Sequence, residues 1–347
     1  MITIKPDFYD NFKCIASKCT DNCCIGWEID IDDTTKEKYD NIEGTFSEKL
    51  HKNIGYNGQD YYFKLAKNDR CPFLNEDNLC ELILNCGEDM LCDICREHPR
   101  FYEWYENYTD MGIGLCCEEA CGLLFENNDS LNFMAYDDGK DEDDEFINSI
   151  VKTRSIAFNL IANRKDKFNE CIINLINFGK AVQNKFFAEI EEKATPDLSK
   201  TEVMEKLLAL FEKCEPFDEN YPILISKIKE SIDEIEENKN AFHKYLGEDF
   251  YAYEKLLTYI IFRYYMKALY DGDLQSKITF SLINLWLVEC IDVLIWLKAK
   301  TYNTSDRINS VKDWSKQIEY SDENINLLIS ELRNNLELNG ENIIKLF

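Results

Sequence analysis

The stretch FSLINLWLVECIDVLIWLK, residues 280–298, is the most apolar segment of the chain, and it decides what kind of fold the rest must build. It is long enough to cross a lipid bilayer as a helix. Glu289 and Asp292 interrupt it, however, and an acidic side chain at a bilayer centre costs about 3 kcal/mol. We therefore predict a buried core helix and no transmembrane segment.

A helical pattern extends over most of the chain around this segment. Apolar residues recur there at i, i+3, i+4 and i+7, the spacing of an amphipathic helix that buries one face. The pattern predicts helices at residues 144–161, 170–192, 200–212, 221–237, 249–270, 276–300 and 321–336. The predicted fold class is therefore mainly α.

The first part of the chain has shorter and more irregular signals. Residues 27–33 (WEIDIDD) alternate apolar and acidic side chains, as a short strand does. Residues 53–66 combine turn residues with an aromatic run, which is typical of a hairpin. Helical turns in residues 79–102 are interrupted at Gly87 and stopped at Pro99.

An acidic run, AYDDGKDEDDEF at residues 135–146, separates these two kinds of sequence. A dense run of like charges is typical of a solvated linker. We therefore predict a loop-rich, cysteine-dense N-terminal region at 1–134, a linker at 135–146 and an α-helical domain at 147–347. In this prediction the N-terminal region packs on the helical region.

The charge of the chain limits its partners. The 347 residues include 39 Lys and Arg against 66 Asp and Glu, a net charge of −27. This acidic field repels nucleic-acid phosphates and anionic membranes, and it attracts lysine-rich protein surfaces. The first residues, MITIKPDFYDNFKC, contain no basic segment followed by an apolar run, so we expect no secretory signal and a cytoplasmic protein.

Fifteen cysteines are the most unusual feature of the composition, and twelve of them fall between Cys14 and Cys121. Disulfides are rare in the cytoplasm, and an odd number does not suit a simple disulfide framework, so we predict metal binding. The other three, Cys171, Cys214 and Cys290, are isolated in apolar surroundings, where a free cysteine packs as a small hydrophobic residue.

The twelve cysteines form four blocks. They are Cys14, Cys19, Cys23 and Cys24 in CIASKCTDNCC; Cys71 and Cys80 in CPFLNEDNLC; Cys86, Cys92 and Cys95 in CGEDMLCDIC; and Cys116, Cys117 and Cys121 in CCEEAC. Only Cys92 and Cys95 have the CxxC spacing of a zinc knuckle, whereas iron–sulfur clusters accept more varied spacings. The cysteine spacing therefore leaves zinc and an iron–sulfur cluster as alternative metal centres. Among the histidines only His98, near Cys95, is considered for such a site.

Cys23 and Cys24 are direct neighbours in the sequence. In an extended backbone, neighbouring side chains point to opposite faces, so these two thiols would not easily bind one metal ion. Either one binds and the other packs, or the pair serves two centres or a polynuclear cluster.

Taken together, these cysteine blocks resemble the flagellin lysine-N-methylase family. The resemblance rests on FKCIASKCTDNCCIGWEIDID, CPFLNEDNLC, CGEDMLCDICREHPRFY and GIGLCCEEACGLL. The matching positions are Cys14, Cys19, Cys23, Cys24, Gly26, Trp27, Ile31, Asp32, Cys71, Pro72, Phe73, Leu74, Cys80, Gly87, Glu88, Cys95, Pro99, Arg100, Cys117, Glu119 and Ala120. It covers roughly the first 125 residues well and the remainder weakly. The double-cysteine block is also similar to small zinc- or iron-chelating domains.

The resemblance implies methyl transfer from S-adenosylmethionine to lysine ε-amines of flagellin, with a 4Fe–4S cluster required. The implied ligands are Cys14, Cys19, Cys23, Cys24, Cys71, Cys80, Cys95 and Cys117. Arg96 and Arg100 are then expected to hydrogen-bond the cluster sulfurs or the carboxylate of the cofactor. The sequence departs from the family in its extra thiols Cys86, Cys92, Cys116 and Cys121, and in Glu118, where a proline is usual.

The sequence does not assign a catalytic base. A lysine amine must lose its proton before it attacks a methyl group, and the candidate bases are Glu28, Asp30, Asp32, Glu289 and Asp292. No glycine-rich nucleotide loop or hydrolase motif is present. One alternative is therefore a non-catalytic zinc- or iron-binding protein, such as a metal carrier or redox sensor. A further alternative is a structural protein whose thiols are free.

Overall fold

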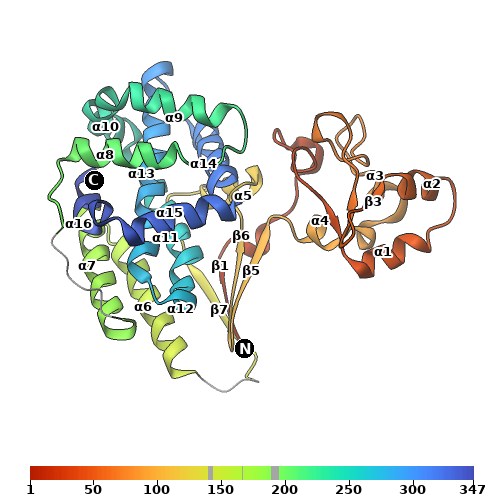
Figure 1. Ribbon diagram of the computed structural model, residues 1–347, viewed down its shortest axis with the longest axis horizontal. Coiled ribbons are helices and arrows are strands. Elements are labelled where there is room, and N and C mark those ends of the chain that lie inside the picture. Colours follow the sequence, from red (N-terminus) through yellow and green to blue (C-terminus); the bar gives the residue numbers. More distant parts are fainter. Residues whose placement is uncertain (140–143, 166, 189–194) are drawn as a thin grey trace. The chain divides into compact units, whose positions relative to one another are not determined.

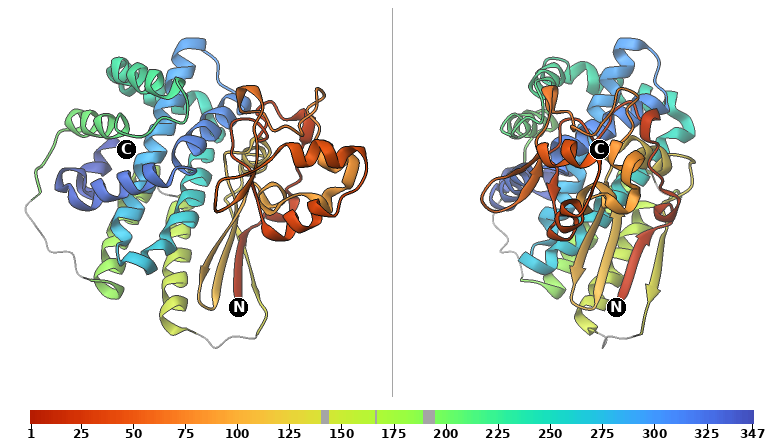
Figure 2. Two further views of the ribbon diagram at one scale, coloured as in Figure 1. Left: turned by 45° about the vertical axis from the view of Figure 1, so that its right-hand side comes forward. Right: turned by 90° about the vertical axis from the view of Figure 1, so that its right-hand side faces the viewer.

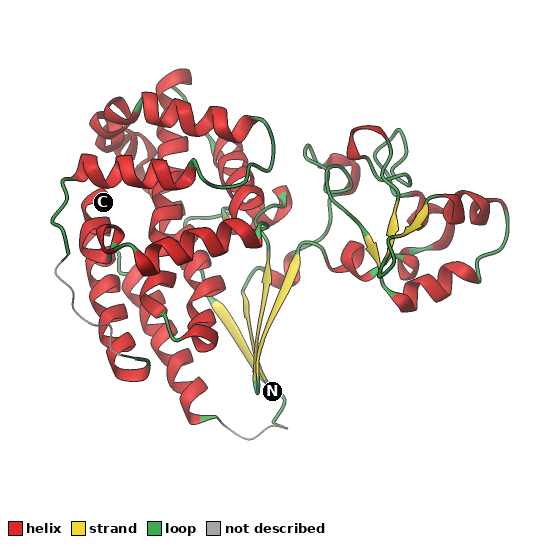
Figure 3. Cartoon of the chain, in the orientation of Figure 1, coloured by secondary structure: helices red, strands yellow, loops and turns green. Residues whose placement is uncertain are grey.

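The computed structural model describes residues 1–139, 144–165, 167–188 and 195–347, and these divide into two compact units. The helical unit comprises Met1–Asp10, Tyr102–Cys116 and Cys121–Phe347, and the cysteine-rich unit comprises Asn11–Phe101 and Cys117–Ala120. Figure 1 shows the chain coloured along its sequence, and Figure 3 shows that helices dominate it. The mainly α prediction is confirmed.

The helical unit contains most of the helices of the described chain. They are α6 Glu145–Ile161, α7 Phe168–Phe186, α8 Lys200–Phe211, α9 Asn220–Glu230, α10 Ile232–Leu246, α11 Tyr251–Tyr264, α12 Ala268–Asp271, α13 Leu274–Ala299, α14 Thr304–Ile318, α15 Asp322–Asn334 and α16 Gly340–Ile343. A short helix, α5 Glu118–Leu124, begins in the cysteine-rich unit and ends in the helical unit. These bounds confirm the predicted helices that begin near residues 144, 200, 276 and 321.

Three predicted helices differ in their extent, and other helices were missed. The prediction 221–237 merged two helices, because the turn at Ser231 interrupts the apolar pattern only briefly. The prediction 249–270 ends instead at Tyr264, where a short 3₁₀ turn precedes α12. In the prediction 170–192, α7 ends at Phe186, and residues 189–192 lie outside the described part of the chain. Helix α14 and the short helices α5 and α16 were not predicted.

Helix α13 is the centre of the helical unit (Figure 2). It packs against α7, α10, α11, α14, α15 and α16, and from Leu274 to Val293 every residue except Gln275 is buried. Its first turn is capped by Asp273, whose carboxylate accepts a hydrogen bond of 3.0 Å from the Ser276 N–H. Burial on all sides explains why this helix is apolar around its whole circumference.

By length and composition, α13 is the one helix in the described ranges that qualifies as a membrane span, and 89% of its most apolar window is buried inside the protein. Such burial is what a core helix shows.

A four-stranded sheet, which except for the first two residues of β5 belongs to the helical unit, was not predicted. Its strands are β1 Ile2–Pro6, β5 Arg100–Tyr105, β6 Tyr108–Ile113 and β7 Phe133–Asp137, in the order β5-β6-β1-β7. Strand β1 runs parallel to β6 and antiparallel to β7. Residues 135–137, which the sequence assigned to the linker, therefore end a strand. The boundaries 1–134, 135–146 and 147–347 stay a prediction, and linker residues 140–143 lie outside the described residues.

A buried ion pair joins this sheet to the helices. Arg154 of α6, only 1% exposed, donates to both carboxylate oxygens of Asp110 on β6, at 2.6 and 2.8 Å. It also donates to the Phe262 carbonyl of α11 at 3.1 Å. One guanidinium therefore connects three elements, and its hydrogen bonds offset the free energy that burying the two charges costs.

Replacing Arg154 tests this role. We expect Arg154→Met to lower the free energy of unfolding by about 3–5 kcal/mol, because it leaves the buried Asp110 carboxylate without its counter-charge. The matched control is Lys229→Met, which removes an exposed ion pair with Glu212 and should change stability by less than about 1 kcal/mol. Urea unfolding of the three proteins measures both changes. Equal effects of the two substitutions would contradict this role.

The cysteine-rich unit has a small mixed fold. Its strands are β2 Asp30–Ile31, β3 Ile54–Tyr56 and β4 Tyr61–Phe63, in the antiparallel order β2-β4-β3, and its helices are α1 Asp33–Asp40, α2 Thr45–Lys52, α3 Glu81–Cys86 and α4 Asp93–Glu97. The predicted hairpin at 53–66 is confirmed. The strand predicted at 27–33 is limited to the two residues of β2, because α1 already begins at Asp33. The predicted break is found at Gly87, whose φ of 92° ends α3, and α4 ends before Pro99.

Candidate functional site

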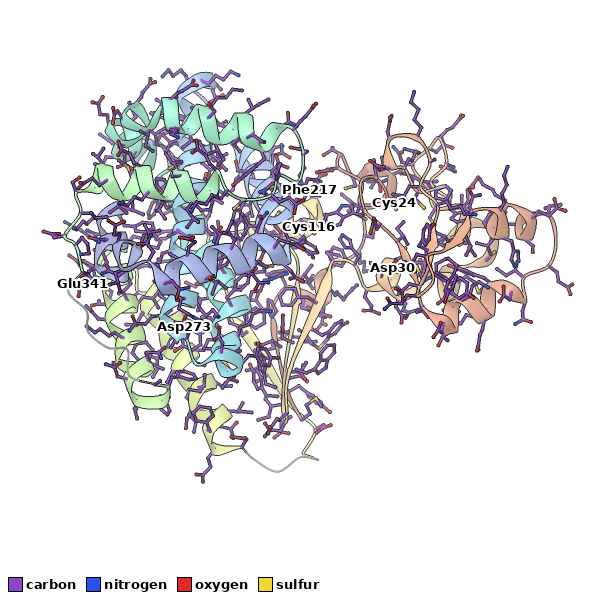
Figure 4. All side chains as sticks on the ribbon, in the orientation of Figure 1. Cys24, Asp30, Cys116, Phe217, Asp273 and Glu341 are labelled. Atoms are coloured by element: carbon purple, nitrogen blue, oxygen red, sulfur yellow. The ribbon has the colours of Figure 1, made fainter. Side chains whose placement is uncertain are left out.

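Five thiols gather on the apolar core of the cysteine-rich unit. Cys71 and Cys92 are part of that core, and Cys24, Cys80 and Cys95 pack against it. The backbone N–H of Cys71 donates to the Cys24 carbonyl at 2.8 Å, and the N–H of Cys95 donates to the Cys92 carbonyl at 3.0 Å. Three of the sequence blocks, far apart along the chain, are therefore brought together by folding. Figure 4 labels Cys24 within this unit.

Two pairs of thiols share hydrogen bonds. The thiol of Cys95 hydrogen-bonds Cys92 and lowers the pKa of Cys92, whereas the pKa of Cys95 is raised by the same bond and by burial. Cys23 and Cys24 behave in the same way, with the pKa of Cys23 lowered and that of Cys24 raised. Each pair therefore holds one thiol that ionises readily next to one that keeps its proton.

The adjacent Cys23 and Cys24 have different neighbours. Cys24 interacts electrostatically with Cys71 and Cys80, on the apolar core. Cys23 instead has His98 beside it, which lowers the pKa of Cys23 further. The two thiols therefore differ in their other neighbours, but they lie in a turn and hydrogen-bond each other, so the expectation that extended backbone points them to opposite faces is wrong.

A second group of thiols surrounds Cys23. Burial raises the pKa of Cys19 to about 11, and Glu118 and Cys23 add to this effect. Burial also raises the pKa of Cys117 to about 12, with Cys23 and Cys19 adding to it. Glu118 lies 3.6 Å from the Cys19 sulfur and accepts hydrogen bonds from the N–H and hydroxyl of Thr20, at 2.8 and 2.7 Å.

The fit of these residues to a metal can be tested on the described chain. Within it, no three side chains of Cys, His, Asp or Glu converge at the spacing of ligands to one metal ion. The donors nevertheless fit a cluster in kind, because they are thiols held in contact as pairs. The ligand set given by the sequence accordingly stays a prediction.

The remaining predicted residues are placed as follows. Cys14 is exposed, and its sulfur accepts a hydrogen bond of 3.4 Å from Ala16 N–H. Arg96 pairs with Asp93 and Glu97 on its own helix, and the guanidinium of Arg100 lies 5.1 Å from the centre of the Phe12 ring. Of the extra thiols, Cys116 and Cys121 belong to the helical unit.

Sequence reasoning left Cys92 out of the ligand set, although the structure pairs it with Cys95. The signal that could have found it was its CxxC spacing, which was recognised but given less weight than the resemblance.

The candidate bases fall into two kinds of environment. Glu28 and Asp30 are exposed. Asp32 caps α1 and accepts hydrogen bonds from the N–H groups of Thr35 and Asp93, at 2.8 and 2.9 Å. Burial opposes the charge of Asp32, but these hydrogen bonds outweigh it and lower its pKa. Glu289 and Asp292 lie on α13, in the buried core of the helical unit.

Glu289 is a stabilised carboxylate. It lies 2.5 Å from the ammonium of Lys239 and 2.5 Å from Nε2 of His243, both on α10. Burial alone would raise the pKa of Glu289, but these two partners outweigh it and lower the pKa. Burial likewise disfavours the charge of Lys239, and the carboxylate of Glu289 reverses that effect. The carboxylate is therefore held by direct ion pairs in the core.

Asp292 is in the opposite situation. Its Oδ2 accepts a hydrogen bond of 2.7 Å from the hydroxyl of Tyr253, but its Oδ1 has no partner in the described chain. Burial raises the pKa of Asp292 from 3.8 to about 6, although Ser310, Arg307 and Tyr253 oppose this. Its charged form is therefore unfavourable in the folded protein near neutral pH.

Removing this charge should stabilise the fold. The pKa is higher in the folded than in the unfolded chain, so the Asp292 charge lowers stability as pH rises from about 4 to 6 and above. We expect Asp292→Asn to raise the free energy of unfolding by roughly 3 kcal/mol at pH 8 and by little at pH 4. The control Asp233→Asn, on an exposed position of α10, should show no such pH dependence. Thermal unfolding across pH measures both, and a gain that persists unchanged at pH 4 would refute the assignment.

A surface depression of about 540 Å³ is present elsewhere in the helical unit. It is lined by Pro196, Ser330, Glu331, Asn334, Asn335, Leu336 and Glu337. None of the predicted site residues lies in it.

These features define a mainly α protein with a cysteine-rich unit and a buried polar centre on its core helix. Residues 136–341 match the family described as the FliB lysine N-methylase C-terminal domain, which covers more than half of the chain. The chain belongs to this family. The resemblance seen in the cysteine blocks is confirmed, and the family match lies mainly in the helical part, where the sequence alone offered no sharp motif.

Relatives with a printed function share part of this chain. It is 29% identical over 140 residues to the lysine-N-methylases of Salmonella choleraesuis and Salmonella typhimurium, over 37% of this chain and 33% of each relative. It is 32% identical over 136 residues to the flagellar biosynthetic protein FliU of Salmonella muenchen, over 37% of this chain and 79% of FliU. The match therefore spans about a third of the length of the curated lysine-N-methylases. No solved structure matches the chain.

Proposed function

We propose that this protein methylates lysine ε-amines on a partner protein, with flagellin as the substrate and S-adenosylmethionine as the methyl donor, in the cytoplasm. The observation that carries the proposal is the family match over residues 136–341. The names of the relatives, lysine-N-methylase and flagellar biosynthetic protein, support it. The net charge of −27 adds support, because it attracts a lysine-bearing surface.

In the proposed reaction, the lysine ammonium first gives its proton to a base. The neutral nitrogen then attacks the methyl carbon, the N–C bond forms, and the C–S bond breaks. The electron pair of that bond stays on sulfur, so S-adenosylhomocysteine leaves as a neutral thioether. Asp32 and Glu289 are weak candidates for the base, because their partners hold their pKa values low.

We propose that the cysteine-rich unit holds a 4Fe–4S cluster, with zinc as the alternative. The core-facing thiols Cys24, Cys71, Cys80 and Cys95 would bind it, with Cys92 in contact with Cys95. An iron–sulfur cluster supplies one-electron chemistry when bound. The chain's own contribution is to hold the thiols against an apolar core, which limits the access of water.

The activity test uses protein purified without oxygen. We expect transfer of labelled methyl groups from S-adenosylmethionine to purified flagellin, detected on lysines by mass spectrometry. The control is flagellin whose lysine amines have been chemically blocked, which should stay unlabelled. Flagellin that remains unlabelled by protein with a full metal content would overturn the proposed activity and favour the non-catalytic metal-binding alternative.

The metal content gives a separate test. We expect iron and acid-labile sulfide in the wild-type protein, and loss of at least half of both in Cys24→Ser and Cys95→Ser, since thiolate is the ligand that iron–sulfur clusters use. The matched control is Cys86→Ser, in the same unit and outside the predicted ligands. Full iron in both variants would exclude these two thiols as ligands, and stoichiometric zinc without sulfide would establish the alternative metal.

A further inference from the structure

The buried polar groups of the helical unit also include Arg307 of α14. Arg307 is only 6% exposed, yet its Nε and Nη2 have no hydrogen-bond acceptor in the described chain. Its guanidinium lies 5.5 Å from the centre of the Tyr302 ring and 5.9 Å from that of Phe125. Aromatic faces therefore hold the side chain, while part of its donor capacity is unused.

An unpaired acceptor lies close to this unpaired donor. Asp292 is fully buried, and neither its Oδ1 nor the buried hydroxyl of Tyr302 has a partner at hydrogen-bond geometry in the described chain. The hydroxyls of Tyr302 and Ser310 nevertheless lie near enough to the Asp292 carboxylate to lower its pKa. Arg307 lowers the pKa of Asp292, so the two charges sense one another. In the described chain, however, they form no ion pair within 4 Å. The buried centre formed by Arg307, Asp292 and Tyr302 therefore contains separated, complementary charges.

This separation is costly and is maintained by the packing. A buried polar group without a partner lowers stability, and a direct Arg307–Asp292 ion pair would remove part of that cost. Tyr253 instead fixes the Asp292 carboxylate at 2.7 Å, and the rings of Tyr302 and Phe125 fix the guanidinium. A cation and an anion held apart in this way complement a molecule that has both charges on neighbouring atoms.

We propose that this centre binds the zwitterionic α-amino-acid end of a small molecule. The α-carboxylate pairs with the free donors of Arg307, the α-ammonium pairs with Oδ1 of Asp292, and the Tyr302 hydroxyl completes the hydrogen bonds. This inference rests on the proposed function, because S-adenosylmethionine ends in such a group. It explains how a chain without a glycine-rich loop would hold that cofactor.

The centre lies next to an exposed connection of the chain. Tyr302 and Arg307 are both in or near the connection from α13 to α14, in which Lys300, Thr301 and Asn303 are exposed. An amino-acid end bound at Asp292 would therefore leave the reactive sulfonium on the side of this connection. The neighbouring carboxylate of Glu289 is already held by direct ion pairs with Lys239 and His243 and takes no part.

The experiment compares ligands that differ only in this end. Isothermal titration calorimetry on the holoprotein uses S-adenosylhomocysteine, methionine, and 5′-methylthioadenosine, which lacks the amino-acid group. We expect Arg307→Met and Asp292→Asn each to weaken S-adenosylhomocysteine binding about 10- to 100-fold, because each removes a charge-assisted hydrogen bond. Binding of 5′-methylthioadenosine should not change, and the control Arg333→Met, an exposed arginine of the same unit, should bind all ligands as the wild type does.

The outcomes distinguish a failure of the proposed binding site from a failure of the proposed methyl transfer. Unchanged S-adenosylhomocysteine binding in both variants overturns the site and leaves the proposed methyl transfer standing. Equal weakening of 5′-methylthioadenosine also overturns it, because the effect would then be a general loss of structure. Binding of methionine but not of S-adenosylhomocysteine supports the site and overturns the proposed methyl donor. Asp292→Asn is expected to be more stable than the wild type at pH 8, so unfolding would not explain a loss of binding.

Discussion

The complete burial of α13 is the constraint on which the helical unit depends. A helix covered on every side must find partners for its polar residues among its neighbours, and these partners fix how the neighbours pack. Asn284 accepts a hydrogen bond of 2.8 Å from the indole N–H of Trp314 on α14, and Glu289 pairs with Lys239 and His243 on α10. The polar residues of this apolar helix therefore determine which helices lie against it and where.

The two acids of α13 show how one helix serves both stability and function. Glu289 and Asp292 are three residues apart and almost equally buried, but only Glu289 has a direct cationic partner. A sequence selected only for stability would replace Asp292 by a neutral residue, because its charge is unfavourable. Local conflicts of this kind are expected where a protein binds a ligand, since the ligand supplies the missing partner.

The sequence predicted the helical fold well because its signal is local. The periodicity of residues 276–300 specifies a helix without knowledge of what surrounds it, whereas β1 pairs with β6 across more than a hundred residues, a relation that no local pattern contains. The same distinction applies to the sites. The cysteine blocks, the CxxC spacing of Cys92 and Cys95, and Asp292 are local features of the sequence, but the contact of Cys24 with Cys71 and Cys80, and the unused donors of Arg307, depend on the folded chain.

The paired thiols have a further consequence for the cysteine-rich unit. In Cys23–Cys24 and in Cys92–Cys95, one thiol has a lowered pKa because the other donates a hydrogen bond to it. A metal binds thiolates, so it must displace the proton that the two thiols of a pair share. When that proton leaves, the hydrogen bond between the two thiols is lost. The same contacts that hold the thiols together without metal thus make binding release protons.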